Sequence, residues 1–120
     1  DHAPHSAEEK SHPFGKCLNG VVGLETSFPV MFTHFVKTGM MSIERLVALM
    51  STNPARRFGI PVCGYTLFAP DEEYTVDPAL CHTMGRSSPF ATDRLFGRWY
   101  ATVIDGEAVL IDPALADKQG

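Results

Sequence analysis

The sequence predicts an α+β fold, with helices in the first half of the chain and strands in the second. Apolar residues recur at helical spacing between positions 24 and 50. Beyond Gly59 the pattern changes to short β-prone runs, and two of these flank Asp105-Gly106, a dipeptide suited to a hairpin turn. At 120 residues and 44% apolar content, the chain can bury one modest core.

The first helix is predicted to run from Leu24 to Val36, and Thr38-Gly39 supplies a stop. A second helix should follow, with Ser42 as its N-cap and an apolar face formed by Ile43, Leu46, Val47, Leu49 and Met50. A separate short helix is expected from Asn53-Pro54, read as a capping residue and a first-turn proline, to Phe58-Gly59.

The second half predicts strands at Tyr65–Phe68 and at Tyr74–Val76, separated by Ala69-Pro70-Asp71. The strongest strand prediction is a hairpin in which 99–104 and 108–111 flank Asp105-Gly106. The last residues, 114–120, are expected to form a frayed tail.

The composition limits the kinds of molecule that the chain is expected to bind and the environment that suits it. Ten basic and fourteen acidic residues leave a formal charge of -4 without long runs of either sign, so nothing favours nucleic acid or an anionic membrane. The apolar runs are interrupted well before the roughly 18 residues that a membrane span needs. Three cysteines without CxxC spacing suggest neither a disulfide framework nor a cysteine zinc site, which fits a reducing cytoplasm.

The first 20 residues are rich in His, Pro, Gly, Ser and charge, and they predict a long loop. Asp1, His2 and His5 open this loop, and a carboxylate beside imidazoles is the chemistry of zinc sites and general bases. The alternative is a solvated loop whose histidines have no chemical role. Pro4 stiffens the backbone between the histidines, and at Asn19-Gly20 backbone amides could approach a ligand closely.

Three ordered blocks carry a family resemblance: DHAPHSAEEK, then NGVVGLETSFP, then MSTNPARRFG. Together they resemble the C-terminal part of dihydroorotases of the class I type, in the amidohydrolase superfamily. The likeness is close over the first 60 residues or so and looser through EEYTVDPALCHTMGRSSPF and LFGRWYATVIDG. The segment that relatives usually carry after Gly59 is nearly absent.

The resemblance implies a parent with a (β/α)₈ barrel and a small C-terminal β domain. Residues 1–59 would then hold the loop after barrel strand 8 and the last helices, and residues 60–120 an abbreviated part of the β domain. The implied activity is reversible, zinc-dependent hydrolysis of (S)-dihydroorotate to N-carbamoyl-L-aspartate in de novo pyrimidine biosynthesis. The chain would be an incomplete piece of that enzyme.

The same resemblance assigns roles to four residues. Asp1 would bind zinc and carry the proton between the metal-bound hydroxide and the ring nitrogen. His5 would bind the substrate, donating to its carboxylate, and Asn19 and Gly20 would form the second substrate-contacting pair. His2 has no implied role beyond a structural hydrogen bond.

One aspartate cannot hold zinc, because catalytic zinc sites generally require about three protein ligands. The isolated chain is therefore expected to be inactive, with one or two zinc ions bound mainly by ligands that it lacks. The alternatives are a non-catalytic dihydroorotase-like subunit that partners aspartate transcarbamoylase, and another cyclic amidohydrolase such as an allantoinase or a dihydropyrimidinase. Expected partners are the small-molecule substrate and either a homodimer or aspartate transcarbamoylase.

Overall fold

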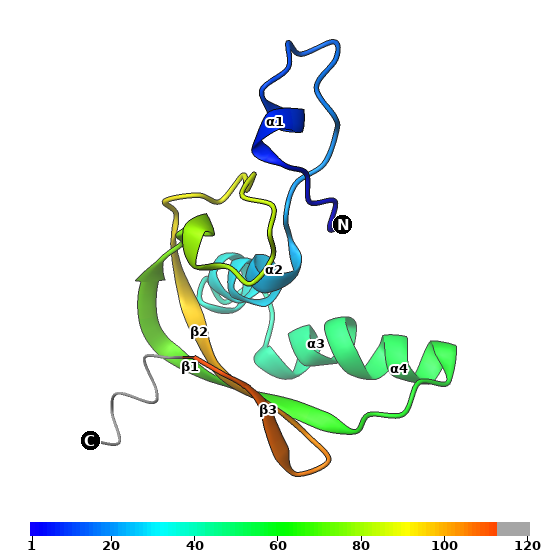
Figure 1. The fold of residues 1–120 in the computed structure, drawn as a ribbon. Helices are drawn as coiled ribbons and strands as arrows, with labels where there is room; N and C mark the ends of the chain where they lie inside the picture. Colours follow the sequence, from blue (N-terminus) through cyan, green and yellow to red (C-terminus); the bar gives the residue numbers. More distant parts are fainter. Residues whose placement is uncertain (113–120) are drawn as a thin grey trace, which may run out of the picture.

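The computed structural model describes residues 1–112, which form a three-stranded antiparallel sheet packed against helices, with the N-terminal segment projecting away from this body (Figure 1). The helices are α1 (Ala7–Lys10), α2 (Leu24–Met31), α3 (Ile43–Val47) and α4 (Asn53–Phe58), with π-helical segments η1 (Phe32–Val36) and η2 (Ala48–Thr52) and a short 3-10 turn η3 (Pro78–Leu80). The strands are β1 (Gly64–Thr75), β2 (Arg94–Ile104) and β3 (Glu107–Ile111), in the order β1-β2-β3. The α+β prediction is confirmed. The predicted tail at 114–120 lies outside the described residues.

The segment predicted as a continuous loop contains the short helix α1, so that prediction was wrong at this point. The Ser6 hydroxyl accepts from the Glu9 amide at 3.2 Å, and the Ser6 amide donates to the Glu9 carboxylate at 2.8 Å. This is a capping box, in which two unpaired helix-terminal donors are satisfied reciprocally. The bonds from the Ser6 backbone and hydroxyl lower the pKa of the Glu9 carboxyl, and the nearby His5 adds to the effect.

The first predicted helix is confirmed as α2 continuing into η1, and Gly39 beyond it has a left-handed φ of 76°. Its apolar face packs on the sheet through Phe28 and Phe32, whose rings meet the Phe68 ring with centroids 4.7 and 5.7 Å away. Gly97 on β2 makes room for this contact, because a Cβ there would lie 3.1 Å from the Phe32 ring. Phe32 is consequently 3% exposed and belongs to the core.

The second predicted helix begins as expected, with the Ser42 hydroxyl accepting from the Arg45 amide. The short helix predicted next is found as α4, but it is not separate and Asn53 is not its cap, because the chain stays helical from α3 through η2 into α4. Asn53 lies inside this run with a helical backbone, and its amide donates to the Ala48 carbonyl in π-helical register. That wider register directly before Pro54 accommodates a proline, which would otherwise disrupt an α-helix. The end at Gly59, with φ 64°, is confirmed.

The two predicted strands on either side of Pro70 are one strand, β1, so the predicted separation at Ala69-Pro70-Asp71 was wrong. The pairing with β2 is nevertheless irregular there: it passes from Ala69↔Arg98 directly to Glu73↔Phe96. Three residues of β1 therefore correspond to Gly97 alone on β2, which is a bulge. Proline cannot donate to a sheet ladder, so it belongs at such an interruption.

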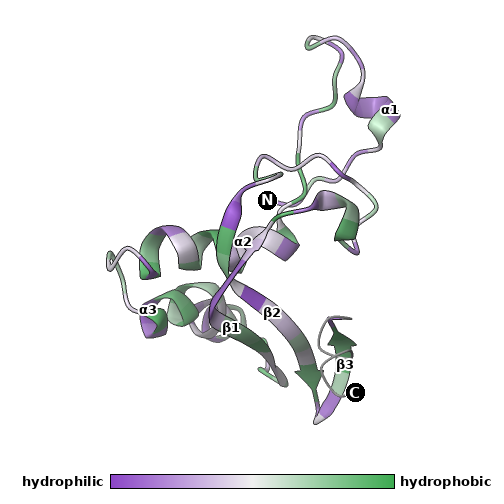
Figure 2. Ribbon diagram, turned by 90° about the vertical axis from the view of Figure 1, so that its left-hand side faces the viewer, coloured by the Kyte–Doolittle hydropathy of each residue, from purple (hydrophilic) through white to green (hydrophobic). Residues whose placement is uncertain are grey.

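The C-terminal hairpin is confirmed. Asp105 and Gly106 have φ values of 51° and 85°, the two positive angles of a type I′ turn, and Ile104 pairs with Glu107 across it. All five residues of β3 are exposed. Figure 2 shows apolar residues along both strands of the hairpin and on the helices.

A charged cluster joins β1, β2 and the residue after β3. The Arg98 guanidinium donates to the buried Asp112 carboxylate at 2.9 Å and lies 3.5 Å from Glu72, which also accepts from the Tyr100 hydroxyl. Partial burial would lower the pKa of Arg98, but the bond and charge of Asp112 outweigh it and raise that pKa. The cluster therefore satisfies the charges that the sheet partly buries.

A broad apolar groove of about 980 Å³ lies between α2, η2 and the sheet. Its lining includes Phe28, Val47, Met50, Phe68, Trp99 and Val103. At its margin Leu24, the first residue of α2, is 68% exposed. Within residues 1–112, no helix is long and apolar enough to cross a membrane.

Candidate active site

The opening motif, residues 1–5, is held in place by residues 20–21, at the end of the N-terminal loop. The Ala3 amide donates to the Val21 carbonyl at 2.9 Å, and Gly20 packs against Ala3 from the same side. A Cβ on Gly20 would lie 2.5 Å from the Ala3 Cβ, and the Gly20 φ of 127° is one that L residues rarely adopt. Only glycine therefore permits this approach of the two segments.

His5 and Asn19 are brought together as expected of two groups at one site. His5 Nε2 lies 2.7 Å from the Asn19 carbonyl oxygen, and Gly20 follows directly beside the imidazole. Because a carbonyl can only accept, Nε2 must carry the proton of this bond. His5 Nδ1 faces the Glu9 carboxylate at 3.7 Å. The Asn19 contact is made by its backbone, so its side-chain amide is not used in this bond.

Lys10 fixes the same loop, a role for which the sequence pattern contained no signal. Its ammonium group donates to the carbonyl oxygens of Leu18 and Gly20 at 3.1 and 3.0 Å. Because the capping box of α1 holds Lys10 and the lysine holds the backbone on both sides of Asn19, the helix and the Asn19-Gly20 pair form one unit.

Asp1 is exposed, and its carboxylate accepts from the neighbouring His2 amide at 2.8 Å. It lines neither the apolar groove nor the smaller cavity beside His5. The structure thus assembles His5, Asn19 and Gly20, whereas Asp1 belongs to neither cavity. Among residues 1–112 no group of three or more His, Cys, Asp or Glu side chains could hold a metal ion, so zinc does not fit the described residues by themselves.

His2 makes the structural hydrogen bonds that were expected of it. Its Nδ1 accepts from the amides of Gly23 and Leu24 at 3.2 and 3.3 Å. These amides belong to the N-terminus of α2, where Gly23 offers no side-chain cap. His2 therefore caps the helix from a distance of 21 residues along the chain.

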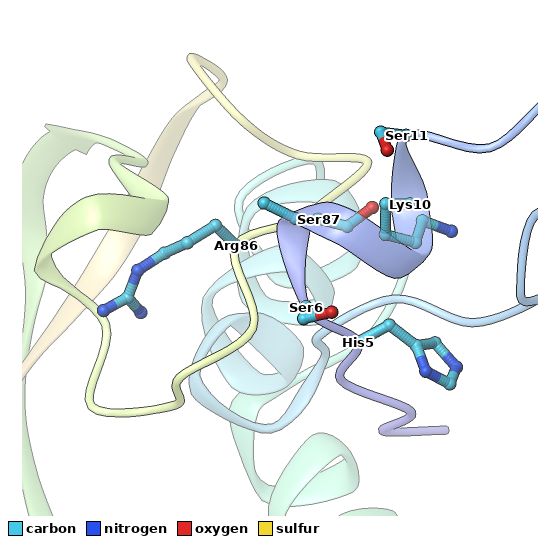
Figure 3. A pocket seen from close by; sticks show the side chains of 7 residues that line it. His5, Ser6, Lys10, Ser11, Arg86 and Ser87 are labelled. Carbon is cyan, nitrogen blue, oxygen red and sulfur yellow. The ribbon is translucent and has the colours of Figure 1, made fainter.

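A cavity of about 300 Å³ lies next to His5. Its lining consists of His5, Ser6, Ala7, Lys10, Ser11, Arg86 and Ser87. Figure 3 shows that the Arg86 side chain extends away from His5 and Lys10, and its guanidinium donates to the carbonyls of Cys81 and Thr83. The volume approaches the lower end for ligand pockets, but its charged groups do not converge on a common point.

Glu25 joins the first turn of α2 to the loop that follows η3 and packs against the opening motif. Its carboxylate accepts from the amides of His82 and Thr83 at 2.9 and 3.0 Å and from the Thr83 hydroxyl at 2.8 Å. Partial burial alone would raise the pKa of Glu25, but these bonds outweigh it and hold the pKa below its usual value. The loop continues to Gly85, where a Cβ would lie 2.8 Å from Pro4.

The lowered pKa of Glu25 predicts a pH-dependent stability. A carboxyl whose pKa is lower in the folded state stabilises the fold above its unfolded pKa, and that contribution is lost as the pH falls through the folded pKa. Glu25→Gln should therefore lower the melting temperature at neutral pH and flatten its dependence on pH below 4.5, the ordinary pKa of this carboxyl. Circular dichroism melts between pH 3 and pH 7 measure this.

Glu107→Gln is the matched control, since it removes the same charge from an exposed position on β3. If both variants lost the same amount of stability at every pH, the bonds of Glu25 would have no special effect and the prediction would be wrong.

Comparison with known proteins finds relatives along nearly the whole chain. It is 38% identical to a dihydroorotase of Listeria innocua serovar 6a, 37% identical to one of Shouchella clausii and 40% identical to one of Anaeromyxobacter sp. (strain K), each over 117 residues and 91% of this chain. The chain spans only 27 to 28% of the length of these relatives. No family model matches it. The resemblance stated from the sequence motifs is confirmed.

Proposed function

We propose that this chain is a segment of a dihydroorotase, because 91% of its length aligns with curated proteins of that name at 35 to 40% identity. The activity proposed for the whole protein is reversible hydrolysis of the cyclic amide of dihydroorotate to N-carbamoyl-aspartate. Since the chain spans just over a quarter of its relatives, residues 1–59 are proposed to close a (β/α)₈ barrel and 60–120 to belong to a small β domain.

The observation that carries this proposal is the assembly of His5, Asn19 and Gly20. Three residues to which the family resemblance assigns substrate binding meet across 14 positions of sequence, joined by the 2.7 Å bond from the His5 imidazole. A solvated loop without function would not need the close approach at Gly20. Nor would it need the two hydrogen bonds from the Lys10 ammonium group to the backbone on either side of Asn19. Both features support a rigid binding element.

In the proposed reaction Asp1 carries the proton. Water adds to the ring carbonyl carbon, the bond between that carbon and the ring nitrogen breaks, and the proton taken from the water is delivered to the nitrogen. A carboxylate can accept and return this proton within one active site. The His5 imidazole would orient the substrate by donating to its carboxylate through Nε2, exchanging the Asn19 carbonyl for the substrate.

Zinc is proposed for the whole protein, with Asp1 as one ligand. Since the described residues contain no metal-holding group, the remaining ligands have to come from other parts of the enzyme. The groove beside α2 and η2 is consistent with this proposal, because apolar surface of that extent is commonly covered by neighbouring structure.

The test is an assay of the full-length protein with zinc, in both directions of the reaction. Interconversion of dihydroorotate and N-carbamoyl-aspartate is expected, and the 120-residue chain alone should be inactive. A folded, zinc-loaded full-length protein without activity would refute the enzyme and favour a non-catalytic subunit that binds aspartate transcarbamoylase. Activity on allantoin or a dihydropyrimidine instead would identify another cyclic amidohydrolase. A cytoplasmic location and a homodimer are proposed with the function.

A further inference from the structure

His2 connects the opening motif to the start of α2. Its Nδ1 accepts two backbone N–H bonds, from Gly23 and Leu24, and these amides have no partner within their own helix. The N-cap residue Gly23 has no side chain to replace this acceptor. The imidazole therefore supplies the cap that the local sequence lacks.

The same contact fixes the residue next to it. Asp1 is bonded to His2 itself, whose amide donates to the Asp1 carboxylate at 2.8 Å. The Asp1 carbonyl lies against Gly23, where a Cβ would come within 2.4 Å of its oxygen. Asp1 is thus held between the His2 backbone and the Gly23 backbone, and both are tied to α2 by the imidazole.

The geometry also defines the chemical form of the ring. An imidazole nitrogen that accepts two N–H bonds carries no proton, so neutral His2 has its proton on Nε2. His2 lines neither cavity, and it forms no metal-holding group with other described residues. Its ring is bonded by the amides of Gly23 and Leu24, so its effect is exerted through the backbone at the start of α2.

We infer that His2 is a positioning residue for the Asp1 carboxylate, acting by capping α2 through Nδ1. This inference rests on the proposed function, because it concerns the orientation of the proposed proton carrier. The helix supplies the rigid reference, since α2 is anchored on the sheet by Phe28 and, in the continuous segment η1, by Phe32. A catalytic group displaced by about 1 Å can lose about 100-fold in rate.

The test compares three substitutions of His2 in the zinc-loaded full-length enzyme. His2→Ala removes the acceptor, His2→Asn places an amide oxygen where Nδ1 lies, and His2→Gln places its oxygen one bond further out. His2→Ala and His2→Gln should lower kcat by about 10- to 100-fold, the usual effect of losing a group that orients a catalytic residue. KM should change little, because His5 and Asn19 are untouched, and His2→Asn should restore most of kcat.

A second readout does not depend on activity. Amide hydrogen exchange at Gly23 and Leu24, followed by NMR, should be faster in His2→Ala and slow again in His2→Asn. The ¹⁵N shift of His2 Nδ1 in the wild type should be that of an unprotonated, accepting nitrogen.

The outcomes separate the two proposals. An active wild-type enzyme whose kcat is unchanged by His2→Ala, or an asparagine variant that behaves like the alanine variant in both readouts, overturns the inference alone. An inactive wild-type enzyme overturns the proposed function and this inference with it.

Discussion

Replacing Asp1 with alanine in the full-length enzyme is expected to lower kcat by about 10²- to 10⁴-fold, the range typical for loss of a general acid or base. The reason is that a single carboxylate is proposed to take the proton from water and return it to the ring nitrogen. Asp1→Asn should be nearly as slow, because an amide of the same size cannot accept and return the proton. Steady-state rates in both reaction directions measure the effect.

His12→Ala is the control for this prediction, since His12 is exposed and lies in the same N-terminal segment. It should keep the wild-type kcat. If Asp1→Asn were as fast as the wild type, Asp1 would not carry the proton, and if His12→Ala were as slow as Asp1→Ala, the loss would reflect damage to the segment rather than chemistry.

The largest expected effect on stability is that of Phe32→Ala, a loss of about 3 to 5 kcal/mol in the free energy of unfolding. Phe32 is 3% exposed, stacks on Phe28, meets the Phe68 ring and covers Gly97, so removing its ring leaves a cavity between η1 and the sheet. Urea unfolding followed by the fluorescence of Trp99, the single tryptophan, measures the change.

Phe14→Ala is a matched control, because it deletes the same side chain from a position that is 99% exposed. Its effect should stay within about 0.5 kcal/mol, as for most surface substitutions. Equal losses for the two variants would mean that the aromatic cluster does not stabilise the fold.

Much of the secondary structure followed from local patterns. The Asp105-Gly106 hairpin and the glycine stops at Gly39 and Gly59 depend on backbone angles that few residues adopt, so the sequence was informative there. Asn53-Pro54 was misleading, because a capping signal acts only where the preceding residues are not helical. The π register of η2 had no sequence signature that could have corrected it.

For the candidate site, the sequence predicted a set of residues and not the contacts that connect them. His5, Asn19 and Gly20 were predicted as substrate-binding residues, and the structure brings them together. The spacing of Ser6 and Glu9 fits a capping box, a signal that the loop prediction missed. The side chains of Lys10, Glu25 and His2 form hydrogen bonds with backbone groups that lie 8 to 58 positions away in the sequence. Such pairings depend on tertiary packing and leave no periodic pattern in the sequence.

The exposed strand β3 has a consequence for handling the chain. Within residues 1–112 it borders the sheet on one side only, so backbone donors and acceptors along its outer edge remain open to another molecule. Glu107 is its single charged residue, and Val109, Leu110 and Ile111 are exposed beside it. Edges of this kind template intermolecular strand addition. Purified preparations are therefore expected to self-associate at high concentration, and Val109→Lys should suppress this association.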